Sequence, residues 1–94
     1  MKIFSPDEAV KHAYKLMLRN GFIPTCSKTK ESTYFMKPGY RGRKIRISNH
    51  KTFVDLHQDV AANVWFDSNT IINDIEFRVN QAIKQYQRFK RKAS

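Results

Sequence analysis

The sequence predicts a two-layer α+β domain in the order α-β-β-β-(β)-α, with both helices on one face of an antiparallel sheet of three or four strands. Three observations predict this class: helical periodicity near each end of the chain, short β-rich segments between the two periodic regions, and proline and glycine residues where strands would reverse. The 94 residues are enough for one domain, residues 1–94, and leave little room for a second.

The first helix is predicted to begin after Ser5 and to end at Asn20-Gly21. Ser5-Pro6-Asp7-Glu8 has the form of a capping box, in which Ser5 accepts from the backbone N–H of Glu8 and the Glu8 side chain reaches back. Apolar residues then recur on one face, and a glycine follows the last periodic residue. The apolar residues on this face are Val10, Ala13, Tyr14 and Met17.

The middle of the chain predicts strands at Phe22–Cys26, Ser32–Met36 and Lys44–Ser48, with a turn at Pro38–Gly42. In Lys44–Ser48 polar and apolar residues alternate, which predicts that Ile45 and Ile47 face the core. We therefore expect Lys44, Arg46 and Ser48 to face outward, on the face of the sheet that the helices leave open. Phe53–His57 and Val60–Phe66 are candidates for one further strand or a hairpin.

A long last helix is predicted after Asp67 or Ser68, either of which can cap it. Its apolar residues recur at spacings of three and four: Ile71 or Ile72, Ile75, Val79, Ala82 or Ile83, Tyr86 and Phe89. Cations in its final turns complement the negative end of the helix dipole.

The formal charge of +10 is large for this length and indicates an anionic partner. Residues 21–52 hold eight cations against Glu31, residues 53–74 hold four Asp and no cation, and residues 75–94 hold six cations against Glu76. The single cysteine, Cys26, cannot form an internal disulfide, and no run approaches the roughly 20 apolar residues of a membrane span. We expect a cytoplasmic protein without a membrane partner.

The segment Lys37–Lys51 concentrates the recognition chemistry of the chain. Arginine forks and lysine ammonium groups bind phosphate oxygens, and an aromatic ring among them can stack on a base or sugar. The candidate nucleic-acid-binding residues here are Lys37, Tyr40, Arg41, Arg43, Lys44, Arg46, His50 and Lys51. The alternative is a solvated hairpin whose charges protect an edge strand. The clustering and the absence of nearby acids favour binding.

A second basic run closes the chain and contributes Arg88, Arg91 and Lys92 as candidates. The alternative interpretation is that these cations only stabilise the end of the helix, through the helix dipole. The run gains a binding role if the helix end lies beside the hairpin.

Other motifs predict no catalysis, no metal and no cofactor. His50 and His57 lie near Asp55 and Asp59, but metal sites show firmer ligand spacing, and no nucleophile motif or phosphate loop is present. Trp65 and Phe66 are expected in the core, with an exposed Trp65 at a protein interface as the alternative.

Four features recur together in a known family: Arg19-Asn20-Gly21-Phe22 after the first helix, Tyr34 on a strand, Gly39–Gly42 at a turn, and Ile45–His50 on the next strand. With them, residues 16–51 resemble the HicA-type mRNA interferase toxins, small basic domains with a double-stranded-RNA-binding-like fold. The resemblance implies this fold and RNA as the partner.

The chain departs from that family where its catalytic histidine would lie. The family carries a glycine-serine-histidine stretch shortly before the strand tyrosine, whereas Thr29–Tyr34 contains no histidine. Without this general base the ribonuclease mechanism does not carry over. Double-stranded-RNA-binding domains also place lysines at the start of the last helix, where this chain has Asp67–Thr70.

Three hypotheses follow. The first is a non-enzymatic nucleic-acid-binding protein, RNA being favoured over DNA, of a kind that phages and mobile elements encode. The second is a phage-type inhibitor that uses the basic hairpin against a host protein. The third is a HicA-like ribonuclease toxin with a displaced His50 or His57. A sensor of small phosphorylated signals also fits a basic surface.

Overall fold

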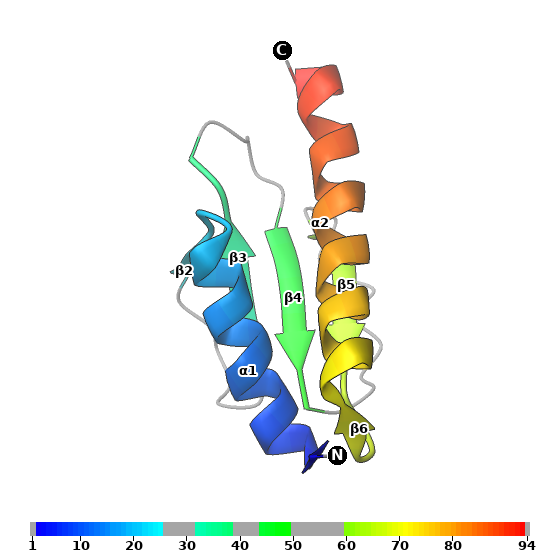
Figure 1. Cartoon of the computed structure of the whole chain (residues 1–94). Coiled ribbons are helices and arrows are strands. Elements are labelled where there is room, and N and C mark those ends of the chain that lie inside the picture. Colours follow the sequence, from blue (N-terminus) through cyan, green and yellow to red (C-terminus); the bar gives the residue numbers. More distant parts are fainter. Residues whose placement is uncertain (1, 26–31, 39–43, 50–59, 94) are drawn as a thin grey trace.

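The computed structural model describes residues 2–25, 32–38, 44–49 and 60–93, and for residues 32, 60, 61 and 88–93 it describes the backbone alone. The elements are β1 (Ile3–Phe4), α1 (Pro6–Arg19), β2 (Ile23–Thr25), β3 (Ser32–Met36), β4 (Lys44–Ser48), β5 (Val60–Trp65), β6 (Thr70–Ile71) and α2 (Ile72–Ala93). Both helices cover the same face of the main sheet, so the predicted two-layer α+β class is confirmed (Figure 1).

The main sheet has the strand order β2-β3-β4-β5. Strands β2, β3 and β4 are antiparallel as predicted, with Phe35 opposite Ile45 and Thr33 opposite Ile47. Strand β5 instead runs parallel to β4, with Ile47 opposite Val64, so the expectation of an entirely antiparallel sheet is wrong for this strand. A parallel neighbour needs a crossover connection and not a hairpin turn. The predicted strand at Phe53–His57 lies outside the described residues.

The predicted start of α1 is confirmed. The Ser5 backbone N–H donates to Glu8 Oε1 at 2.9 Å, and the Glu8 N–H donates to Ser5 Oγ at 3.3 Å. The backbone hydrogen bond from Ser5, helped by the bond with its side chain and by Lys2 and Lys11, lowers the pKa of Glu8 below its usual value. The helix ends at Asn20, and Gly21 has a φ of 84°, a left-handed conformation that favours glycine.

The second helix begins later than predicted. Thr70 and Ile71 form β6, which pairs antiparallel with Ile3 and Phe4 of β1, so Asp67 and Ser68 precede a strand and do not cap the helix. This small sheet joins the two segments that lead into the helices. Both helices therefore rise from the same end of the molecule (Figure 1).

The core lies between the helices and the sheet. Ile45 and Ile47 are fully buried, which confirms that these two residues of β4 face the core. Tyr86 of α2 packs edge-on against Phe22, with ring centroids 5.0 Å apart. The buried apolar residues are Ala9, Ala13, Met17, Phe22, Phe35, Ile45, Ile47, Ala62, Val64, Phe66, Ile75, Val79, Ala82, Ile83 and Tyr86.

Candidate nucleic-acid interface

A hydrogen bond joins the first residue of the Lys37–Lys51 segment to α2. The backbone N–H of Lys37, at the end of β3, donates to Tyr86 Oη in α2 at 3.0 Å. The Lys37 ammonium group lies 5.6 Å from the centroid of the Phe22 ring, a cation–π contact. Lys37 is half-buried, and the hydrogen bond with Tyr86 defines the position of its backbone relative to α2. The base of the predicted hairpin thus lies beside the last turns of the helix.

Further cationic residues belong to the same end of the molecule. Arg19 lies in the last turn of α1, and Lys44, which is half-buried, is the first residue of β4. Lys84 is exposed on α2 two residues before Tyr86. The backbone of α2 continues through the positions of Arg88, Arg91 and Lys92. The structure therefore brings Lys37, Lys44 and the C-terminal run of α2 to one end.

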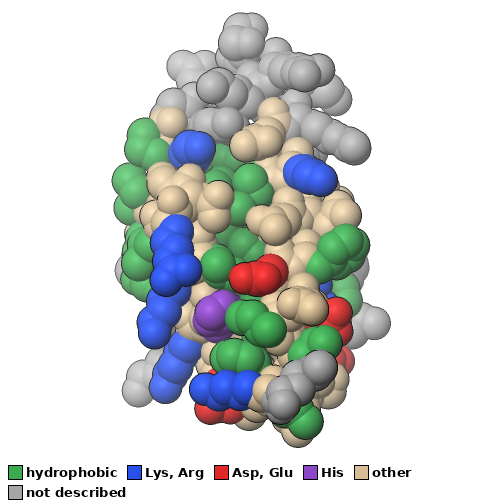
Figure 2. Space-filling model, in the orientation of Figure 1, with side chains coloured by type: hydrophobic (Ala, Val, Ile, Leu, Met, Phe, Trp, Pro, Cys, Tyr) green, Lys and Arg blue, Asp and Glu red, His purple; other side chains and the backbone are tan. Residues whose placement is uncertain are grey.

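The described carboxylates lie toward the opposite end. Asp7 and Glu8 occupy the first turn of α1, Asp67 precedes β6, and Asp74 and Glu76 lie near the start of α2. On the face shown in Figure 2, carboxylates extend from the middle to the lower end, and none of the described ones lies above. Lys2 and Lys11 also lie toward this end, and Lys15 lies farther along α1, so the segregation concerns the acids.

Arg46 is a correction to the predicted interface. It was expected on an open face of the sheet, but only 3% of its surface is exposed, and Ser48 on the same side is fully buried. Arg46 lies in the middle of the sheet, opposite Tyr34 on β3 and Asn63 on β5, and its Nη1 donates to Asn63 Oδ1 at 2.9 Å. A long side chain that has a neighbouring side chain on each adjacent strand buries its aliphatic stem against them. Arg46 is thus a structural residue and not a surface phosphate ligand.

The remaining predicted residues of the hairpin, Tyr40, Arg41, Arg43, His50 and Lys51, lie outside the described residues, as do His57, Asp55 and Asp59. Within the part of the chain that the structure describes, no group of three metal-ligating side chains occurs. His12, on α1, contacts the Phe4 ring, with centroids 5.5 Å apart.

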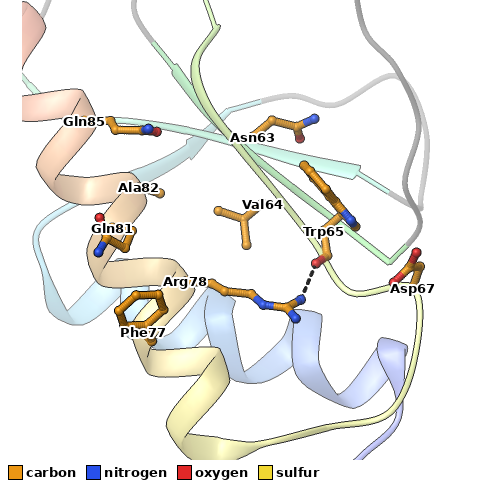
Figure 3. Close-up of a pocket in the computed structure, with 9 residues that line it drawn as sticks. All are labelled: Asn63, Val64, Trp65, Asp67, Phe77, Arg78, Gln81, Ala82 and Gln85. Carbon is orange, nitrogen blue, oxygen red and sulfur yellow. Dashed lines mark hydrogen bonds between the residues drawn. The ribbon is translucent and has the colours of Figure 1, made fainter.

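The structure also shows a groove between β5 and α2 that was not predicted. Its volume is about 440 Å³ (Figure 3). We call it the β5–α2 groove, and its lining residues are Asn63, Val64, Trp65, Asp67, Phe77, Arg78, Gln81, Ala82 and Gln85. One sequence signal pointed toward it: Phe77 is a large apolar residue outside the core stripe of the last helix, and 61% of its surface is exposed.

One wall of the β5–α2 groove is held by Arg78. Its Nη1 donates to the Trp65 backbone oxygen at 2.9 Å, and its guanidinium carbon lies 5.4 Å from the centroid of the Phe66 ring. These contacts join α2 to the end of β5, and Figure 3 shows the hydrogen bond between Arg78 and Trp65. Phe66 is buried as expected, whereas Trp65 is half-buried and lines the groove.

No protein-family model matches this chain, and comparisons with curated proteins and with solved structures found no similar protein. The resemblance to HicA-type toxins therefore stays a prediction from the residues quoted above. Over the described residues, neither helix has the length and apolar character that crossing a bilayer requires.

Proposed function

We propose that this protein is a small, non-enzymatic, cytoplasmic nucleic-acid-binding protein. Its binding surface is the end of the molecule where the base of the β3–β4 hairpin meets the C-terminal turns of α2. The hydrogen bond from Lys37 to Tyr86 carries the proposal, because it joins the first residue of the Lys37–Lys51 segment to α2 two positions before Arg88, although the two bonded residues are 49 positions apart in the sequence.

The distribution of charge supports this choice of surface. A phosphate backbone is attracted where cations gather and is repelled by carboxylates. The described carboxylates lie toward the starts of the helices, away from the proposed surface. The net charge of +10 adds long-range attraction to any polyanion. The resemblance to HicA-type toxins favours RNA over DNA.

The residues proposed to contact phosphates are those predicted from the sequence, without Arg46. Lys37 and Lys44 lie at the base of the surface, and Tyr40 is proposed to stack on a base. The set is Lys37, Tyr40, Arg41, Arg43, Lys44, His50, Lys51, Arg88, Arg91 and Lys92. Burial of Arg46 removes it from this set, since its guanidinium already binds Asn63.

The proposal is tested by filter binding of single-stranded and duplex RNA and DNA at low and at physiological salt. The variant Arg88→Gln/Arg91→Gln/Lys92→Gln removes three cations from the proposed surface. We expect at least a tenfold loss of affinity, and a flatter dependence on salt because each lost phosphate contact lowers the slope by about 0.7 to 0.9.

The matched control is Lys2→Gln/Lys11→Gln/Lys15→Gln, which removes the same charge at cations outside the proposed surface. Equal losses in both variants would indicate a general charge effect and contradict the proposed surface. No binding of any nucleic acid at low salt would contradict the function. A stoichiometric protein partner that survives nuclease treatment would then favour the inhibitor hypothesis.

A further inference from the structure

We propose that the β5–α2 groove binds one unstacked nucleobase of a single-stranded nucleic acid. This inference rests on the proposed function and names a base site for it, separate from the phosphate surface. The groove volume of about 440 Å³ falls within the roughly 300 to 1,000 Å³ of small-ligand sites, so a base with its sugar can enter.

The aromatic side chains of the groove are suited to stacking. Phe77 lies at the rim on the α2 side with 61% of its surface exposed, which costs hydration free energy unless something covers the ring. Trp65 contributes a second aromatic lining residue from β5. Every nucleobase has a π-face that stacks on such rings.

The polar side chains of the groove are suited to reading a base edge. Gln81 and Gln85 are four residues apart, so they lie on one face of α2, and Gln85 extends toward β5 (Figure 3). Each amide offers both donors and an acceptor, which the edges of all four bases require. The two amides are neutral, and the guanidinium of Arg78, the cation among the lining residues, already donates to the Trp65 backbone oxygen and packs over Phe66.

The Asp67 carboxylate at one end of the groove and the course of the α2 backbone beyond the other end indicate a direction for the bound nucleotide. The Asp67 carboxylate lines one end and repels phosphate. Beyond Gln85, α2 continues to positions 88 and 92, which follow it by three and seven residues, the spacing that keeps helix residues on one face. The base therefore enters the groove while its phosphates extend toward the C-terminal turns of α2.

An extended peptide added to the edge of β5 fits the groove less well. Strand addition uses the backbone groups along the outer edge of the sheet. At Trp65 the backbone oxygen already accepts a hydrogen bond from Arg78 at 2.9 Å. The same arginine packs over Phe66, so the groove wall is formed before a ligand arrives.

Trp65 supplies a direct readout, because it is the only tryptophan in the chain. Adenosine, guanosine, cytidine and uridine, which carry no phosphate, are titrated separately while its fluorescence is followed. We expect saturable quenching by at least one nucleoside. Phe77→Ala and Gln81→Ala/Gln85→Ala are expected to abolish it, whereas Asn80→Ala/Gln87→Ala, an amide pair on α2 outside the groove lining, leaves it unchanged.

In parallel, binding of a ten-nucleotide single-stranded RNA is measured. Phe77→Ala is expected to lower affinity about tenfold, the usual scale of one lost stacking contact, without changing the salt slope. Phe77, Gln81 and Gln85 are exposed, so thermal melting of these variants should match the unsubstituted protein.

The outcomes separate the two proposals. If the RNA binds and Arg88→Gln/Arg91→Gln/Lys92→Gln weakens it, but the groove variants change neither affinity nor quenching, the base site is wrong and the proposed function stands. If nucleosides quench Trp65 through Phe77 but no polynucleotide binds at low salt, the groove is a site for free nucleosides, and both the proposed function and the role of the groove in a nucleic-acid complex are wrong. Absence of both signals overturns both.

Discussion

At the scale of single residues, Arg46 shows that alternation along a strand predicts which side chains share a face, but not whether that face is exposed. Polar Arg46 and Ser48 lie opposite buried Ile45 and Ile47, as the pattern predicts, yet both are buried. The difference arises because β4 lies between β3 and β5, so Arg46 has a neighbour on each side, Tyr34 and Asn63.

Arg46→Ala should therefore act on stability and not on phosphate binding. Removing the guanidinium leaves Asn63 Oδ1 without this donor, and hydrogen bonds to charged groups contribute about 1.5 to 3 kcal/mol. We expect a loss of that size in the free energy of unfolding, measured by urea denaturation. Lys84→Ala, at an exposed cation, should change it by less than about 0.5 kcal/mol. Equal stability of the two variants would contradict the structural role.

At the scale of elements, the start of α1 depends on two reciprocal hydrogen bonds between Ser5 and Glu8. Both were predicted because the capping box involves residues only three positions apart. The start of α2 was not predicted, because Thr70 and Ile71 pair with β1, which lies roughly 70 residues away along the chain. Local interactions thus define one helix start and a distant strand defines the other.

The capping box predicts a pH dependence of stability. Since the folded-state pKa of Glu8 is lowered, its contribution is complete above the ordinary pKa of 4.5 and is lost as the pH falls through the lower, folded pKa. Thermal melting of the unsubstituted protein and of Glu8→Gln should differ near neutral pH and converge in acid.

Ser5→Ala provides the comparison for this pH series. This substitution removes the hydroxyl that accepts from the Glu8 N–H and should lower the free energy of unfolding by about 0.5 to 2 kcal/mol. Part of this loss should persist in acid. A difference between the unsubstituted protein and Glu8→Gln that grows in acid would contradict a lowered pKa of Glu8.

At the scale of the whole molecule, the pairing of β1 with β6 starts both helices at one end and directs them to the other. The described carboxylates therefore gather toward the helix starts, while the C-terminal turns of α2 reach the base of the β3–β4 hairpin. The net charge of +10 stays uncompensated within the chain and makes the folded state repel itself.

Salt should consequently act in opposite directions on the free protein and on the complex. Raising the salt from low to physiological concentration screens the self-repulsion and should raise the melting temperature of the free protein. The same increase in salt should reduce the additional rise in melting temperature that single-stranded RNA produces, because counterion release then contributes less to binding. Differential scanning fluorimetry at two salt concentrations, with and without RNA, measures both. A complex whose additional stability is independent of salt would contradict phosphate binding.

The sequence by itself determined the α+β class, the capped first helix with its glycine end, and the strands Ser32–Met36 and Lys44–Ser48, because these depend on local periodicity and on turn residues. The tertiary structure decided the parallel direction of β5, the burial of Arg46, the contact between Lys37 and Tyr86, and the β5–α2 groove. Each of these depends on which distant segments pack together, and spacing along the chain carries no direct record of such packing.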